Sequence, residues 1–351
     1  MSSSFNQLDL AYMDRAIQLA KLGGTQVKTN PNVGAVIVHN QTIIGEGWHE
    51  YFGGPHAEVN ALKSVQERDL QKLKDSTIYV TLEPCNHHGK TPPCVEAIIQ
   101  NKIPRVVIGT LDPNPQMAGS SGRILEAAGI EVCMSERIIE CKNLIEKFSV
   151  QQAEKRPFIT LKWAETFDGF IGSNTERLAI SHPLTQFWTH RLRSERQAIW
   201  VGKNTLVLDN PLLDIRKSTG ITLRIIVLDR KGNLPSHLQI FKHPENILYI
   251  TENHNIIDLP ANVSMHYIYP QTTLSDILRE IYANGIGSIL VEGGAKTLED
   301  FYQQNLWDEC FKIQSPKRNE RANIKAPSVN SSWSLHSQIG PDLIFLKKSK
   351  V

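Results

Sequence analysis

The sequence predicts two α/β domains joined near residue 150. Strand-like and helix-like segments alternate along the chain, and one polar segment, 151–157, interrupts the pattern and ends in a proline. The length of 351 residues also exceeds what one ordinary core holds. Strands separated by helices indicate a mostly parallel or mixed sheet covered on both faces. We therefore expect one domain over 1–150 and a second over 151–351.

The first domain begins with a helix-like segment, Leu8–Leu22, which has apolar residues at helical spacing and ends at two glycines. Two β-rich segments then flank a short polar turn at 39–40, which is typical of a β-hairpin. The segments expected as strands are Val33–Val38, Thr42–Trp48, Ser76–Leu82, Arg105–Gly109 and Ile130–Cys133. The segments expected as helices are His56–Val65, Pro92–Asn101, Ser121–Ala128 and Ile138–Val150.

The second domain repeats the alternation of strand and helix, so its fold class is again α/β. In chain order, its segments are Phe158–Trp163, Pro183–Arg193, Ala198–Val201, Leu223–Leu228, Asn246–Thr251, Leu274–Tyr282, Ser288–Val291 and Thr297–Asn305.

The composition limits the partners and the location. The 38 basic and 36 acidic residues nearly cancel, leaving no bulk charge to attract nucleic acid or a membrane surface. Apolar stretches such as Val33–Val38 are too short to span a bilayer, and the first ten residues do not resemble a secretory signal. Five cysteines do not make a disulfide framework. We expect a soluble, cytoplasmic protein.

The strongest chemical signal is His56-Ala57-Glu58, followed by Pro84-Cys85 and then Cys94. One imidazole and two thiolates form a good zinc ligand set that leaves the fourth position open. His56 and Cys94 lie near predicted helix starts, where the positive helix end favours a thiolate. Glu58 lies beside the metal without ligating it, so it can carry a proton between the attacking water and a leaving amine. The pattern is that of zinc deaminases.

A structural zinc site is the competing interpretation. It would need four ligands, whereas this sequence offers three convincing ones and leaves Glu58 without a role. A lone histidine or cysteine is usually a core residue, but the joint pattern favours catalysis. The other three cysteines, Cys133, Cys141 and Cys310, are interpreted as core or incidental residues.

The cysteine spacing is informative. Eight residues, NHHGKTPP, separate Cys85 from Cys94, where nucleic-acid base deaminases have two. A loop with a flexible glycine, a lysine and a threonine suits a phosphate on the substrate. The long spacing and the lack of a basic groove argue against a nucleic-acid base deaminase.

Several segments of the sequence resemble those of a known family. TNPNVGAVIV, GPHAEVNAL, VTLEPCNHHGKTPPC and LDPNPQMAG resemble the deaminase half of the bifunctional riboflavin biosynthesis deaminase–reductases. LKWAETFDG, LRSERQAIWVGKNTLVLDNPLL, RIIVLD and LVEGGAKTL resemble the reductase half. The resemblance implies a cytidine-deaminase-like three-layer domain followed by a dihydrofolate-reductase-like domain. It also implies deamination of 2,5-diamino-6-ribosylamino-4(3H)-pyrimidinone 5′-phosphate, then reduction of the ribosyl group to ribityl with NADPH.

The resemblance also assigns residues of the deaminase half. His56, Cys85 and Cys94 would hold zinc, and Glu58 would shuttle protons. Asn30 would contact the base. The residues expected to face the ribose phosphate are Lys90, Thr91, Asp112 and Asn114, with Asp112 at a sugar hydroxyl because an acid does not suit a phosphate.

The reductase half has a glycine turn after a predicted strand. Its backbone amides could hold a pyrophosphate, although two glycines after a strand are also ordinary turn chemistry. No G-x-G-x-x-G is present, which disfavours a dinucleotide-binding fold of the Rossmann type. The resemblance places Ala164, Thr205, Asp209, Gly293, Gly294, Ala295, Lys296 and Thr297 at the cofactor. It places Arg193, Leu213, Arg216 and Glu292 at the substrate, with Lys162 close to the ribose.

Two features depart from the reductase pattern. Ala179 stands where the family usually has Trp, and residues 314–330 lack a Pro-Lys-Leu-Leu-Gly run. The alternative is therefore a deaminase whose second half is a degenerate scaffold. In either case we expect a homo-oligomer that binds a small phosphorylated pyrimidine.

Overall fold

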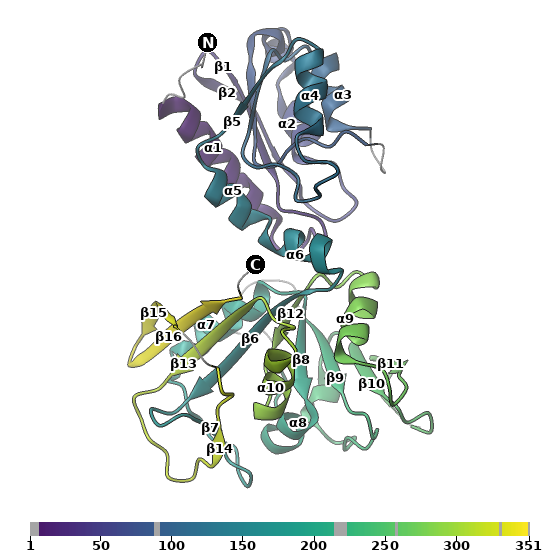
Figure 1. The fold of residues 1–351 in the computed structure, drawn as a ribbon, viewed down its shortest axis with the longest axis vertical. Coiled ribbons are helices and arrows are strands. Elements are labelled where there is room, and N and C mark those ends of the chain that lie inside the picture. Colours follow the sequence, from purple (N-terminus) through teal and green to yellow (C-terminus); the bar gives the residue numbers. More distant parts are fainter. Residues whose placement is uncertain (1–6, 88–91, 214–222, 257–258, 330–331, 350–351) are drawn as a thin grey trace. The chain divides into compact units, whose positions relative to one another are not determined.

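The computed structural model describes residues 7–87, 92–213, 223–256, 259–329 and 332–349. The chain divides into two compact units, Met1–Lys155 and Arg156–Val351, here called unit 1 and unit 2 (Figure 1). None of the described helices is long and apolar enough to cross a membrane.

Unit 1 is built on a mixed sheet with the strand order β2-β1-β3-β4-β5. The strands are β1 (Gly34–His39), β2 (Thr42–Trp48), β3 (Thr77–Val80), β4 (Arg105–Ile108) and β5 (Glu131–Met134). Strand β1 is antiparallel to both neighbours, whereas β3, β4 and β5 run parallel. Asn40 and Gln41 turn between β1 and β2 with φ of 44° and 64°, which confirms the predicted hairpin.

Helices cover both faces of this sheet. They are α1 (Gln7–Ala20), α2 (Ala57–Ser64), α3 (Cys94–Gln100), α4 (Ser120–Ala127), α5 (Ile138–Leu144) and α6 (Glu146–Glu154), with short 3₁₀ turns η1 (Lys21–Gly23) and η2 (Glu67–Asp75). Figure 1 shows α1 and α5 on one face and α2, α3 and α4 on the other. Alternate residues of β1 fill the two cores: Ile37 packs with Ala61 of α2, and Val36 packs with Met13 of α1. The three-layer prediction is confirmed.

One contact in unit 1 matters for the site: α2 lies directly on β2, because a Cβ atom at Gly47 would come within 2.3 Å of the Ala61 backbone nitrogen.

The prediction of a single helix over Ile138–Val150 is wrong. The chain leaves helical geometry at Ile145 (φ −102°, ψ 8°), whose buried side chain separates α5 from α6. Helix α6 then continues to Glu154.

Unit 2 contains a sheet that has nine strands over the described residues, in the order β11-β10-β9-β8-β12-β6-β13-β16-β15. Strands β11 to β13 of this order run parallel, and β16 and β15 add an antiparallel edge. The strands are β6 (Phe158–Glu165), β8 (Ala198–Gly202), β9 (Arg224–Leu228), β10 (Ile247–Thr251), β11 (Val263–Tyr267), β12 (Ser288–Val291), β13 (Glu309–Gln314), β15 (Ser334–Ile339) and β16 (Asp342–Lys348). A separate pair is formed by β7 (Phe170–Gly172) and β14 (Ile324–Lys325).

The helices of unit 2 connect these strands. They are α7 (Thr185–Ser194), α8 (Lys203–Asp209), α9 (Leu274–Ala283) and α10 (Ala295–Gln303), with one 3₁₀ turn, η3 (Gln239–Lys242). Parallel strands end at one edge of a sheet, so the segments after β8 and β12 meet there. Thr297 of α10 lies between them, because a Cβ atom at Gly202 would come within 2.5 Å of its hydroxyl and one at Gly293 within 2.9 Å of its Cβ.

A buried ion pair holds the start of unit 2. Arg156 donates two hydrogen bonds to Asp308, of 2.7 and 2.8 Å, and the backbone N–H of Ile159 donates a third, of 2.7 Å. Both charged side chains are buried. The pair therefore fixes the first strand of the unit, β6, against the segment that precedes β13.

Asp308→Ala should destabilise unit 2 by about 3–5 kcal/mol, because Arg156 would stay buried without its counter-charge. Five of the six tryptophans lie in unit 2, so denaturant unfolding followed by tryptophan fluorescence measures the change. The control is Arg191→Ala, which removes an exposed ion pair with Glu195 and should change stability by less than about 0.5 kcal/mol. Equal midpoints for the two variants would contradict the prediction.

Candidate metal centre and reductase cavity

Three side chains of unit 1 form a group that could hold a metal ion: His56, Cys85 and Cys94. His56 is the N-cap residue of α2, and Cys94 is the first residue of α3, as the predicted helix starts required. Cys85 lies in the segment between β3 and α3. The Nδ1 atom of His56 lies 3.4 Å from each sulfur atom, and all three ligand atoms lie within 4.8 Å of one another.

This group fits zinc. Tetrahedral coordination with ordinary bond lengths separates a nitrogen and a sulfur ligand by about 3.6 Å, close to both distances here. The backbone N–H groups of Cys94 and Val95 bond to the sulfur and the carbonyl of Cys85, at 3.3 and 3.2 Å. These two bonds fix the cysteines relative to each other before any metal binds.

The charges of the group favour a cation. A hydrogen bond from the Cys94 thiol lowers the pKa of Cys85 to about 4, and the same bond raises the pKa of Cys94. The pKa of His56 is raised by its hydrogen bond to Cys85. Glu58, on the first turn of α2, is 3% exposed, and burial raises its pKa. A carboxyl group beside three metal-ligating side chains, but outside the ligand set, is placed for proton transfer.

Asn30 lies near this group through a residue that the sequence did not reveal, His49. The Nδ1 atom of His49 lies 2.9 Å from the carbonyl oxygen of Pro55, so Nδ1 carries the proton. The Nε2 atom then accepts a hydrogen bond of 3.0 Å from the Asn30 amide nitrogen. Burial lowers the pKa of His49, which favours this neutral form. Its ring also lies edge-on to His56, with 5.7 Å between centroids. His49 thus fixes the orientation of the Asn30 amide.

Asp112 and Asn114 lie in one compact loop after β4. The Asp112 carboxylate accepts from the backbone N–H of Asn114 at 2.8 Å, and the side-chain Oδ1 atom of Asn114 accepts from the backbone N–H of Gln116 at 3.1 Å. Burial raises the pKa of Asp112. Lys90 and Thr91 lie outside the described residues.

Sequence reasoning also missed Glu83. It is 5% exposed, and its carboxylate accepts hydrogen bonds from the loop that contains Asp112. The signal available was a glutamate immediately before the Pro84-Cys85 pair, in a segment, 76–86, that is otherwise uncharged.

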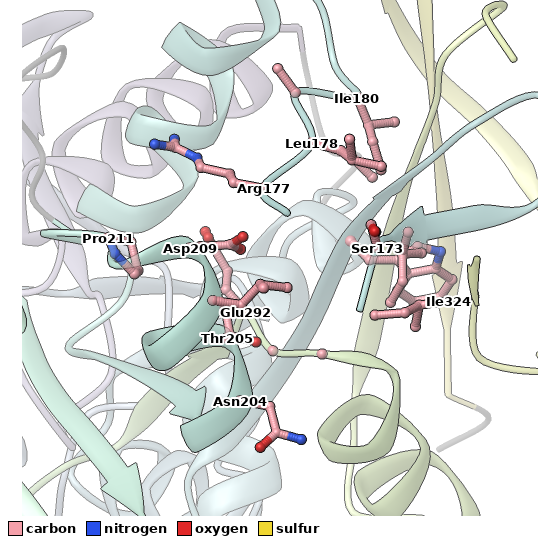
Figure 2. Close-up of a pocket in the computed structure, with 18 of the residues that line it drawn as sticks. Ser173, Arg177, Leu178, Ile180, Asn204, Thr205, Asp209, Pro211, Glu292 and Ile324 are labelled. Carbon is pink, nitrogen blue, oxygen red and sulfur yellow. The ribbon is translucent and has the colours of Figure 1, made fainter. Parts of the chain in front are cut away.

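Unit 2 contains a cavity of about 630 Å³, shown in Figure 2. Residues expected from the sequence that line it are Lys162, Ala164, Arg193, Thr205, Asp209, Leu213, Glu292, Gly293 and Gly294. Arg216 lies outside the described residues. Figure 2 shows Ser173 and Ile324 on the opposite side of the cavity from Asp209 and Pro211. Ala179, the departure noted in the sequence, also lines the cavity.

Three charged side chains form the polar centre of this cavity. Arg193 of α7 donates two hydrogen bonds to Glu292, of 3.0 and 2.7 Å, and the Lys162 ammonium lies 3.8 Å from the same carboxylate. Burial alone would raise the pKa of Glu292, but the two cations lower it to about 2. Burial lowers the pKa of Lys162, while Glu292 raises it. Two cations share one anion, so this cluster suits an anionic ligand.

The glycine turn after β12 fits a cofactor phosphate. Gly294 has φ of −66°, which any residue adopts, so its conformation does not require glycine. What glycine provides at this position is open space in front of the backbone, because it has no side chain. A Cβ atom there would lie 3.4 Å from the Thr205 hydroxyl. Ala295, Lys296 and Thr297 form the first turn of α10 and are absent from the described lining, and the Thr297 side chain packs between two glycines. The volume also suits a cofactor site.

Several residues of this cavity were missed from the sequence. Ser173 and Arg177 line it but belong to no segment that carried the resemblance, and Asn204 lies in such a segment, LRSERQAIWVGKNTLVLDNPLL, but was not singled out. Burial raises the pKa of Asp209, and the positive charge of Arg177 offsets part of that rise. Ser173 and Arg177 lie in the irregular segment after β7, and Asn204 is the second residue of α8.

Comparisons with known proteins agree with both halves. Residues 6–110 match the family described as the cytidine and deoxycytidylate deaminase zinc-binding region. Residues 157–318 match the RibD C-terminal domain. The predicted fold class, a cytidine-deaminase-like domain followed by a dihydrofolate-reductase-like one, is confirmed.

Relatives match along most of the chain. The riboflavin biosynthesis protein RibD of Aquifex aeolicus is 38% identical over 89% of this chain and 88% of its own length. That of Synechocystis is 36% identical, with 96% and 95% covered. The structure of a Thermotoga maritima protein superposes with a TM-score of 0.86 at 36% identity, with 96% and 97% covered. Acinetobacter baumannii RibD gives 0.83 at 31%, with 97% and 98% covered. The chain therefore belongs to the RibD family and is a bifunctional enzyme of riboflavin biosynthesis, with a zinc-dependent deaminase half and an NADPH-dependent reductase half.

Proposed function

We propose that the chain deaminates 2,5-diamino-6-ribosylamino-4(3H)-pyrimidinone 5′-phosphate and then reduces the ribosyl group of the product to ribityl. The Thermotoga maritima relative is described as a diaminohydroxyphosphoribosylaminopyrimidine deaminase and 5-amino-6-(5-phosphoribosylamino)uracil reductase, which supports this order of reactions. The observation that carries the proposal is the His56, Cys85 and Cys94 group with buried Glu58 beside it.

In the deaminase unit, His56, Cys85 and Cys94 hold zinc. Zinc held there supplies a Lewis acid that makes water a better nucleophile near neutral pH. Glu58 takes a proton from the attacking water and gives one to the leaving amine. Water forms the new C–O bond at the amino-bearing carbon, the C–N bond breaks, and ammonia leaves.

The substrate is held by residues on both sides of this group. Asn30 contacts the base, and because His49 accepts from its amide nitrogen, its carbonyl oxygen is available to accept from the base. Asp112 contacts a sugar hydroxyl, and Asn114, Lys90 and Thr91 contact the ribose phosphate.

In the reductase unit, the cofactor lies along the glycine turn and the substrate lies at the charged cluster. The cofactor residues are Ala164, Thr205, Asp209, Gly293, Gly294, Ala295, Lys296 and Thr297, the last three through the first turn of α10. NADPH, when bound, supplies the two electrons that reduce the ribosyl group. Arg193, Glu292, Leu213 and Arg216 hold the substrate, with Lys162 close to its ribose.

The scaffold alternative is disfavoured by the charged cluster. Burying Lys162, Arg193 and Glu292 is costly, and a domain that only supported another would gain stability from apolar residues there. Ionisable side chains with shifted pKa values in a cavity are typical of active sites.

We further propose a cytoplasmic protein that binds small molecules, and neither nucleic acid nor membrane. The near balance of 38 basic and 36 acidic residues supports this. The homo-oligomer stays a prediction, which light scattering coupled to size-exclusion chromatography would test.

The zinc content of the protein tests the assignment of the metal ligands. Purified protein should contain about one zinc per chain, and Cys85→Ser or Cys94→Ser should lose it, because each removes a thiolate ligand. Elemental analysis measures the content. Cys133→Ser, which alters a cysteine outside the group, is the control and should keep its zinc. Full occupancy in both ligand variants would overturn the assignment.

Glu58→Gln should keep zinc but slow ammonia release by about a hundredfold or more, because the amide cannot carry the proton. NADPH oxidation with pre-deaminated substrate should be unchanged, since that reaction belongs to unit 2. Glu50→Gln changes an exposed glutamate and is the matched control. Deamination by Glu58→Gln at near the normal rate would remove Glu58 from the mechanism.

Gly294→Val should weaken NADPH binding at least tenfold, because the side chain occupies the space in front of the turn and approaches Thr205. Calorimetry measures the affinity, and deaminase turnover should not change. Ala283→Val, on the exposed side of α9, is the control for the added bulk. Unchanged affinity would argue against the turn as the cofactor cradle, and no NADPH binding by the unsubstituted protein would favour the scaffold alternative.

A further inference from the structure

Glu83 belongs to the same segment as the metal ligand Cys85, and it forms hydrogen bonds with the loop that contains Asp112 and Asn114. It follows β3 and stands two positions before Cys85. Its backbone N–H donates to the carbonyl of Thr110 at 2.8 Å, which joins the end of β3 to the start of that loop. Its side chain is buried, although nothing in the deaminase assignment uses it.

The Glu83 carboxylate accepts three backbone hydrogen bonds from one segment, 112–121. Oε2 accepts from Asp112 at 3.1 Å and from Gly119 at 2.9 Å, and Oε1 accepts from Ser121 at 3.0 Å. Gly119 is the N-cap residue of α4, so the carboxylate also lies at the positive end of that helix. Both oxygens are therefore engaged by amides at the two ends of the loop.

A second side chain in the segment after β3 also bonds to the 112–121 segment. Asn86, immediately after Cys85, donates to the Ser120 hydroxyl at 2.8 Å. The residues on either side of the Pro84-Cys85 pair thus hold the same loop. Within the loop, Asp112 and Asn114 bond to the backbone of their own turn, so the turn moves as one body when its anchors move.

We propose that Glu83 is a positioning residue for the deamination, which sets the distance between the ribose phosphate contacts and the metal centre. The inference rests on the proposed function, because that function places the ribose phosphate at this loop. A nucleotide bridges the two regions: its base must reach the metal group while its sugar and phosphate reach the loop. Fixing the loop to the segment that contains Cys85 makes both contacts possible at once.

Glutamate is the residue type that this arrangement requires. A carboxylate offers only acceptors, and three N–H groups point at it. Glutamine has the same shape but replaces one oxygen by an NH₂ group, which would face at least one N–H donor. Glu83→Gln therefore loosens one end of the loop with little change in volume.

The test compares Glu83→Gln with the unsubstituted full chain by steady-state ammonia release. We expect KM for the pyrimidine nucleotide to rise at least tenfold and kcat to change by less than about threefold, with zinc content unchanged. Glu126→Gln, an exposed glutamate on α4, is the matched control and should behave like the unsubstituted chain. Asn86→Ala should shift KM in the same direction by a smaller factor, and it serves if Glu83→Gln does not fold.

Amide hydrogen exchange supplies a readout that does not depend on turnover. Exchange at Asp112, Gly119 and Ser121 should accelerate at least tenfold in Glu83→Gln, whereas exchange in β4 should not. Faster exchange with an unchanged KM would show that the loop is not where substrate is positioned, and loss of zinc or of kcat alone would assign Glu83 to the metal group. If the unsubstituted chain releases no ammonia from the nucleotide, the proposed function fails, and the exchange result still reports on the anchoring.

Discussion

The close contact between helix α2 and strand β2 is the constraint on which the metal centre depends. His56 and Glu58 both belong to the start of α2, so their positions follow the helix axis. The helix can approach the sheet this closely because positions 45 and 47 both lack a side chain. Cys85 and Cys94 are fixed separately, because two backbone N–H groups at the start of α3 donate to the sulfur and to the backbone carbonyl of Cys85. The three ligands lie close together because the packing of α2 on β2 and the hydrogen bonds between Cys85 and the start of α3 place them at the same point.

The metal ligands could be predicted from the sequence because their chemistry is local. A histidine two residues before a glutamate, and a Pro-Cys pair before a second cysteine, identify the ligand types without knowledge of the fold. The role of Glu83 could not be predicted in this way. Its partners are backbone N–H groups 29 to 38 positions further along the chain, and every residue except proline offers such a group. His49 was missed for a similar reason, since one of its two partners is a backbone carbonyl.

In unit 2 five of the parallel strands, β6, β8, β9, β10 and β12, were predicted from the sequence, whereas β13 beside β6 and the strands β11, β15 and β16 were not. Strands such as β12 are buried throughout and mostly apolar because both faces are covered, and they are readily identified from the sequence. Strand β15, at the sheet edge, is mostly exposed and polar, so no hydrophobic pattern indicates it. In unit 1, the prediction of one helix over Ile138–Val150 was wrong because the break at the buried residue Ile145 leaves the apolar spacing intact. Arg177 reaches the cavity from an irregular segment, which periodicity does not describe. Asn204 lines it from the first turn of α8, a helix of seven residues that was not among the expected segments.

The charged cluster in the reductase cavity has a consequence for association rates. With Glu292 ionised down to a pH of about 2, the balance of Lys162, Arg193 and Glu292 is one net positive charge for as long as the lysine keeps its proton. A concave, partly apolar wall concentrates the field of such a charge toward the opening. Phosphorylated ligands would be drawn in at long range, and dissolved salt screens that attraction beyond about 10 Å. The rate at which this enzyme captures its anionic ligands should therefore fall as ionic strength rises, even where the contacts within the cavity are unchanged.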